Sequence, residues 1–275
     1  TYLFPIEIPR SAAKASPDVV LFSQETSSTF VGQFVYQDAA YKINSFLSNV
    51  KSYQVQYFDD DFAPALPPMT KPPDTGGPTI QVDSTYMIER LSSFTFPKKG
   101  LYIISTDSLR NGLAVRVETK NFPKPATMDE LIEPLVYLST SEEYQTLSES
   151  TEKKASFDEY WLFNTKSADK AKNAIRAYYR HIREANALFT TYKEGWKTDK
   201  GMIYTIFGPP DSVVKNDTKE IWIYDKTFEL SRISFNFVRV NTAFSDRHYV
   251  LERNGDYKST WFRAVELWRK GRKEY

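Results

Sequence analysis

The sequence predicts an α+β protein in which a β-rich, sandwich-like amino-terminal domain precedes a helical segment and a small α+β domain. Short apolar runs of strand length fill the amino-terminal half, whereas the other half combines a long amphipathic stretch with further strand-like runs. The composition changes near Pro123-Lys124-Pro125. We therefore expect one domain over residues 1–122 and a second over residues 123–275.

The expected amino-terminal strands are short and separated by turns. Residues 53–57 alternate with a period of two, which places Tyr53, Val55 and Tyr57 on one face. Asn111-Gly112 supplies a hairpin signal between the last two runs. The other strand-like runs are 18–22, 30–36, 80–82, 86–88, 101–104 and 113–117. This pattern is typical of an immunoglobulin-like sandwich.

A proline-rich segment at residues 64–78 interrupts these strands. Its six prolines exclude both a helix and a central strand. We expect an exposed loop of polyproline character or an inserted arm.

Four helices are expected between residues 127 and 192. Thr127 starts the first and Ser139 or Thr140 the second, since each is an N-cap residue followed by acids, and a third covers residues 156–164. The long helix over residues 167–192 places its apolar residues on one face. Its opposite face carries the basic residues Lys170, Lys172, Arg176, Arg180 and Arg183.

The rest of the chain predicts strands at 201–207, 220–224, 233–239 and 249–251, and a closing helix at 260–270. The turn Gly208-Pro209-Pro210-Asp211 ends the first of these strands, because its prolines cannot continue it.

One specific motif, Gly195-Trp196-Lys197-Thr198-Asp199, stands directly after the long helix. With the elements that follow it, this motif resembles the GWxTD-domain family from about residue 160 to the end of the chain. The residues that carry the resemblance are Gly195, Trp196, Thr198, Asp199, Gly201, Gly208, Pro209, Pro210, Asp211 and Trp222.

The motif is suited to a helix-to-strand corner. A glycine at position 195 commonly takes the left-handed conformation that stops a helix, and Trp196 can cover the helix end. Thr198 and Asp199 can bond backbone amides in the turn, while Gly201 allows close passage into the next strand.

The resemblance also implies a location. The family is typical of Bacteroidota and occurs in secreted envelope proteins that often carry a lipoprotein signal, with no established catalytic activity. The chain begins with Thr1, and we interpret it as a processed chain or a piece of a longer one. The resemblance implies a cell-envelope protein associated with the outer membrane, on its periplasmic or its surface face, attached only through an upstream lipid anchor or a partner.

The composition excludes several chemistries. The absence of cysteine removes disulfides, thiolate nucleophiles and cysteine-held zinc or iron–sulfur sites. Two histidines are too few for a multi-histidine metal centre, and the glycines do not form a phosphate loop. A net charge of +1 gives no support to nucleic-acid binding. We expect no cofactor, no metal and no catalytic residues.

Two functions remain open. The first is a non-enzymatic subunit that makes protein–protein contacts in an outer-membrane complex, with β-barrel assembly and surface-protein export as the processes considered. The alternative is a carboxylate-dependent or metal-assisted hydrolase of envelope glycans using Asp199, Asp211 or the acidic run Asp59-Asp60-Asp61. A strand between Asp199 and Asp211 would hold them about 20 Å apart, which disfavours a shared site.

The remaining polar residues have ordinary interpretations. We expect His181 to be a half-exposed helix residue and His248 to start a strand without a nearby partner. The acidic run is expected to be a solvated turn. The basic helix face and the tail 269–273 suit anionic lipid, nucleic acid or an acidic partner if they are not simply solvated.

Overall fold

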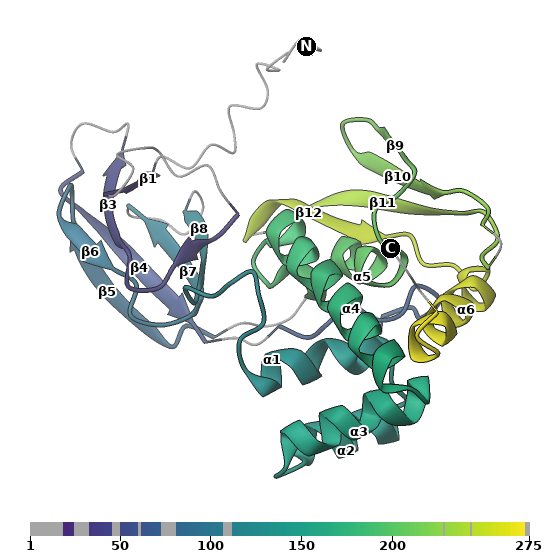
Figure 1. Ribbon diagram of the computed structural model, residues 1–275. Helices are drawn as coiled ribbons and strands as arrows, with labels where there is room; N and C mark the ends of the chain where they lie inside the picture. The colour runs from purple at the N-terminus through teal and green to yellow at the C-terminus, as the bar shows by residue number, and fades with distance from the viewer. Residues whose placement is uncertain are drawn as a thin grey trace. The chain divides into compact units, whose positions relative to one another are not determined.

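A computed structural model describes residues 19–24, 33–45, 50–59, 62–72, 81–106, 112–227, 229–242 and 244–272. The chain divides into two compact units (Figure 1). Unit 1 comprises residues 1–60 and 80–117, and unit 2 comprises residues 61–79 and 118–275. The fold is mixed α+β, with strand-rich sheets first and helices with a further sheet afterwards, which confirms the predicted fold class.

Unit 1 contains two sheets. The first has the order β1-β3-β6, and the second has the order β2-β8-β7-β4-β5. Their strands are β1 Val19–Ser23, β2 Val35–Tyr36, β3 Ala40–Ser45, β4 Ser52–Phe58, β5 Ser84–Glu89, β6 Ser93–Thr95, β7 Gly100–Ser105 and β8 Leu113–Glu118. The pairs β1–β3, β3–β6, β4–β5, β4–β7 and β7–β8 are antiparallel.

The core of unit 1 lies between these sheets. Leu21 and Ile43 from the first sheet belong to one buried cluster with Val55, Tyr102 and Val115 from the second. In β4 the buried residues Tyr53, Val55 and Tyr57 alternate with half-buried glutamines, as expected for a strand with one face in the core. Unit 1 is thus sandwich-like.

The strand predictions for unit 1 contain errors. Residues 81 and 82 are not in a strand, and β3 and β6 were not predicted. In β3 polar residues lie between the apolar ones, and β6 has a single apolar residue, so neither strand contains a continuous apolar run. The Asn-Gly turn and residues 30–32 lie at least partly outside the described residues.

The proline-rich segment is not an exposed arm where the structure describes it. Residues 62–72 are described, and they belong to unit 2. Phe62 and Pro68 are buried, and Ala65 and Met69 pack against the core of that unit. The prolines do exclude regular secondary structure, but an extended chain without a helix or strand can still pack.

The helices of unit 2 begin where side chains cap them. Thr127 and Thr140 each accept a hydrogen bond from the third residue of the helix, and Glu130 and Glu143 complete two capping boxes. The elements are α1 Met128–Ile132, α2 Ser141–Glu149, α3 Lys153–Thr165, α4 Ala168–Phe189, α5 Asp199–Phe207 and α6 Tyr257–Arg269, with 3₁₀ turns η3 Glu133–Tyr137 and η4 Gly195–Lys197.

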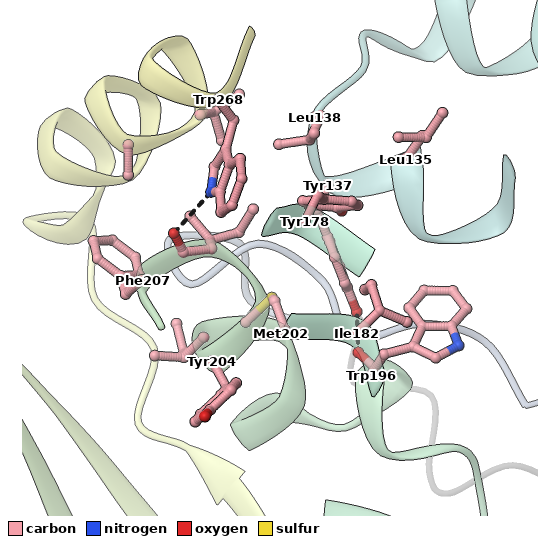
Figure 2. Packing of buried hydrophobic residues seen from close by; sticks show 14 of the residues in the cluster. Leu135, Tyr137, Leu138, Tyr178, Ile182, Trp196, Met202, Tyr204, Phe207 and Trp268 are labelled. Atoms are coloured by element: carbon pink, nitrogen blue, oxygen red, sulfur yellow. Dashed lines mark hydrogen bonds between the residues drawn. The ribbon is translucent and has the colours of Figure 1, made fainter. Parts of the chain in front are cut away.

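The sheet of unit 2 has the order β12-β11-β10-β9, and each pair is antiparallel. Its strands are β9 Ser212–Lys215, β10 Lys219–Tyr224, β11 Ile233–Thr242 and β12 Ser245–Leu251. Trp222, Tyr224, Phe235 and Phe237 lie on one face and are buried in the core shared with the helices. Figure 2 shows this core, in which Trp268 donates its indole N–H to the carbonyl oxygen of Ile206 at 3.0 Å.

Residues 199–207 form helix α5 and not the predicted strand. Every residue of α5 except Lys200 is buried, so its apolar residues show no helical periodicity. A short apolar run fits a buried strand and a buried helix equally well. The signal in favour of a helix was Thr198 as N-cap with Asp199 in the first turn.

Candidate functional site

Gly195 of the motif and Gly201, two residues after it, allow three backbones to pack closely. A Cβ atom on Gly195 would lie 2.0 Å from the carbonyl oxygen of Ala185 in α4, and one on Gly201 would lie 1.8 Å from that of Gly195. We expected Gly195 to end the long helix, but it does not. Helix α4 ends at Phe189 with Thr190 as C-cap, and Gly195 begins η4 without a positive φ. The glycine is needed for space and not for a left-handed turn.

Trp196 joins three elements of unit 2. Its side chain is buried, with its ring centroid 5.8 Å from that of Tyr137 in η3. Its backbone N–H donates to Oδ1 of Asn186 in α4 at 3.1 Å, and its carbonyl accepts from the Tyr137 hydroxyl at 3.1 Å. The main chain of Trp196 therefore bonds α4 and η3, and its ring packs against η3.

Thr198 connects η4 to α5. Its hydroxyl oxygen accepts from the N–H of Gly201 at 3.0 Å, which caps α5, and its O–H donates to the carbonyl of Gly195 at 2.7 Å. Because all three residues are buried, these bonds replace contacts that water would otherwise make.

Asp199 is the buried acid of the motif. Its Oδ2 accepts from the backbone N–H of Leu251 at 2.9 Å, and its Oδ1 forms an ion pair with Arg253. The two side chains are only 8% and 9% exposed. Burial raises the pKa of Asp199, although the Arg253 guanidinium and the Leu251 N–H oppose that shift. The carboxylate thus holds the end of β12 and one cation.

Arg253 extends this contact to the proline-rich segment. Its guanidinium donates to the carbonyl oxygens of Leu66 and, at 2.8 Å, Pro67. Asn254 donates its backbone N–H to the carbonyl of Pro68 at 3.2 Å. These bonds are made to main-chain atoms of the segment, so they position an extended backbone.

The motif and its neighbours hold the other end of the segment. Ala65 donates its backbone N–H to the carbonyl of Lys197 at 2.9 Å, and Nζ of Lys193 donates to the carbonyl of Ala63 at 3.0 Å. The rings of Phe62 and Tyr192 meet edge to face with centroids 4.8 Å apart. We call residues 62–70 the docked segment.

The variable residue of the motif, Lys197, is also buried. Its Nζ lies 3.5 Å from a carboxylate oxygen of Glu133 and 3.3 Å from one of Glu194, and 5.4 Å from the centre of the Trp196 ring. Two acids therefore balance this buried charge.

The turn after α5 involves different contacts. Gly208 has φ of +83° and ends α5, and its carbonyl accepts from the Tyr224 hydroxyl at 2.8 Å. Asp211 is exposed, and its Oδ2 accepts from the backbone N–H of Asp225 at 2.8 Å. Pro209 and Pro210 lie between them, on the surface or half-buried. This turn anchors the start of β9 to the end of β10.

Trp222 borders a small charged cluster. Lys200, the residue after the motif, bonds Glu220 at 2.5 Å, and Lys215 bonds the other carboxylate oxygen at 2.8 Å. Nζ of Lys200 lies 3.5 Å from the centre of the Tyr249 ring and 5.9 Å from that of Trp222. The two lysines hold the pKa of Glu220 below its usual value in spite of its burial.

The candidate acids do not meet. Asp199 contacts Leu251 and Arg253, whereas Asp211 contacts Asp225. Asp59 accepts from the Tyr57 hydroxyl at 2.9 Å, and the other two acids of its run lie outside the described residues. In the part of the chain that the structure describes, no three His, Asp or Glu side chains are grouped so that they could hold a metal ion.

Both histidines are buried, which contradicts the expectation that His181 is half-exposed. His181 is 2% exposed, and its Nδ1 lies 3.0 Å from the carbonyl of Thr205, so α5 covers the helix face that we expected to be half open. The ring of His248 lies 5.0 Å from that of Tyr192, which is a partner that the sequence did not indicate. Burial and the nearby Lys193 lower the pKa of His248 to about 4.

Sequence reasoning missed the residues that complete the corner. Arg253 follows a predicted strand by two positions, and Asn186 is a polar residue among the apolar residues of α4. A polar residue within an apolar stripe was the available signal for Asn186, while no local signal connected Arg253 with Asp199, which lies 54 positions earlier.

The motif residues form a buried structural corner. Comparison with known proteins assigns the chain to a family. The GWxTD domain model matches residues 100–270, more than half of the chain. The chain therefore belongs to the GWxTD domain family, which confirms the resemblance in its motif. No curated protein and no solved structure matches the chain. Among the described residues, no helix has the length and apolar character needed to cross a membrane.

Proposed function

We propose that this protein is a non-enzymatic cell-envelope subunit that makes protein–protein contacts in an outer-membrane-associated complex. The observation that carries the proposal is the burial and bonding of Asp199, the acid of the motif that the alternative function would use as a catalytic group. It is buried and bound by Leu251 and Arg253, so it stabilises the fold and faces no open site. β-Barrel assembly and surface-protein export are the processes that such a subunit would serve.

An edge strand supports the proposed role. β9 lies at one end of its sheet, and all four of its residues are exposed. Val213 and Val214 are 50% and 56% exposed, which is high for valine in a strand. An exposed edge with apolar side chains can pair with an extended segment of another protein.

Purification from native membranes in mild detergent tests the proposal. We expect the chain to co-purify with other envelope proteins in fixed proportions. Isolation of the chain alone, at high yield, would contradict the subunit role.

A pair of variants tests whether β9 makes the contact. Val213→Pro removes a backbone N–H from the open edge of β9, on the side away from β10, while Val240→Ala alters an exposed valine of β11 without changing hydrogen bonding. We expect the proline variant to lose its partners and the alanine variant to keep them. Equal recovery of partners by both variants would show that β9 is not the contact.

A further inference from the structure

A basic stripe lies along the exposed face of α4. Lys172, Arg176 and Arg183 are all exposed, and none has an ion-pair partner within the described part of the chain. At 100° per residue these three positions fall within about 40° of one another, and at 1.5 Å per residue they span about 16 Å along the helix. We call these three residues the basic stripe; Arg180 lies beside it and is half-buried.

The stripe is the centre of the solvent face and not its margin. The buried residues of α4, such as Ala174, Tyr178 and Ala185, lie on the opposite side by the same helical arithmetic. Within α4, every residue of which the structure describes, Asp169 is the one exposed acid, since Glu184 is half-buried and accepts from the Tyr204 hydroxyl. The charge on this face is therefore largely uncompensated.

Apolar side chains are exposed beside the start of the stripe. Leu162 and Phe163, near the end of α3, are 47% and 64% exposed, although α3 otherwise buries its large aromatic residues. Lys166 ends α3 in the left-handed conformation and places its Nζ 3.8 Å from the centre of the Phe163 ring. The corner between α3 and α4 thus combines an exposed aromatic ring with a cation.

The basic tail that the sequence suggested behaves differently from the stripe. Arg269 forms two 2.7 Å bonds with the carboxylate of Glu143, and Lys270 is paired with Glu266. Those charges are neutralised within unit 2. The stripe therefore differs from Arg269 and Lys270 in having no such partners among the described residues, as is also the case for Lys170 and Arg272.

We propose that the basic stripe and the α3–α4 corner dock on an anionic lipid bilayer. Arginine guanidinium groups match phosphate oxygens in a two-pronged geometry, and each basic residue at a membrane surface contributes independently to binding. Phe163 and Leu162 supply apolar side chains of the kind that enter the interfacial region. A net charge of +1 for the whole chain argues against a nucleic acid, which requires a broad basic field. This inference goes beyond attachment through an upstream anchor or a partner and does not depend on the proposed function.

Vesicle sedimentation with the full 275-residue chain tests the inference. The probes are phosphatidylcholine vesicles with about one third phosphatidylglycerol and pure phosphatidylcholine vesicles. We expect the chain to sediment with the anionic vesicles only, and to be released as salt is raised. Equal binding to both vesicles, or to neither, would overturn the proposal.

Charge-matched variants show whether the stripe is responsible. The triple variant Lys172→Gln, Arg176→Gln, Arg183→Gln should lower partitioning onto anionic vesicles about 100-fold, from about fivefold for each residue. The control Lys51→Gln, Lys120→Gln, Lys258→Gln removes the same charge at exposed positions elsewhere and should change it by much less. Equal losses in the two triple variants would show that net charge alone drives binding, and would refute the docking surface.

A last variant tests the apolar part of the surface. Phe163→Ser should weaken binding to anionic vesicles about tenfold, since it removes an exposed ring that enters the interface. All substituted side chains are exposed, so the far-ultraviolet circular dichroism of each variant should match that of the parent chain. Unchanged binding by Phe163→Ser would remove the corner from the proposed surface.

Discussion

Replacing Asp199 by asparagine distinguishes a structural corner from a chemical site. The substitution keeps the shape of the side chain but removes the charge opposite Arg253, whose side chain is 9% exposed. The guanidinium would then be buried against the carbonyl oxygens of Leu66 and Pro67 alone. Loss of one partner from a buried ion pair costs about 3–5 kcal/mol.

That loss is large relative to the stability of a domain. For a unit of this size it corresponds to a fall in Tm of about 6–20 °C. Tryptophan fluorescence reports on unit 2 alone, because unit 1 contains no tryptophan. The five reporters are Trp161, Trp196, Trp222, Trp261 and Trp268.

Two controls make the measurement decisive. Asp211→Asn makes the same chemical change at an exposed turn residue and should cost less than about 1 kcal/mol. The double variant Asp199→Asn, Arg253→Gln leaves no buried charge unpaired, so it should lose less stability than the two single changes together. If Asp199→Asn is as mild as Asp211→Asn, our account of the corner is wrong.

Three further outcomes are expected, each measured by urea unfolding of unit 2. Gly195→Ala should destabilise by at least about 3 kcal/mol, because its Cβ would lie 2.0 Å from a backbone oxygen, whereas Gly255→Ala, with nothing within 4 Å, should change stability by less than about 0.5 kcal/mol. Burial in the folded state lowers the pKa of His248 from 6.5 to about 4, so the unfolded chain takes up the proton first as the pH falls. Lowering the pH from 6.5 to 4 should therefore reduce the free energy of unfolding by up to about 3 kcal/mol. The variant His248→Gln should abolish that part of the decline. Arg269 lowers the pKa of Glu143 from 4.5 to about 2, so the stability that Glu143 contributes should be complete above pH 4.5 and should disappear as the pH falls towards 2. The variant Glu143→Gln should be less stable than the parent near neutral pH and equally stable near pH 2.

The sequence predicts much of the architecture because local signals determine it. Thr127 and Thr140 cap helices in the structure, and the alternation of residues 53–57 matches the buried face of β4. Helix capping and strand alternation depend on neighbours within a few residues, so a single sequence contains them.

The errors occur where burial is complete or where distant residues meet. Helix α5 is buried on nearly all sides, so no polar face revealed its period. His181 is buried because α5 packs over it, and Pro68 because Asn254 and its neighbours hold the docked segment. Contacts of this kind join residues far apart in the chain, and spacing along the sequence carries no information about them.

The docked segment affects where the chain can be divided. The chain passes between the two units three times, after residues 60, 79 and 117, so unit 2 is a discontinuous domain. A fragment that begins at residue 118 keeps the whole motif, yet it removes the carbonyl acceptors of Arg253 and the ring that packs on Tyr192. A recombinant version of this domain therefore needs the docked segment, residues 62–70, supplied by a linker or as a separate peptide.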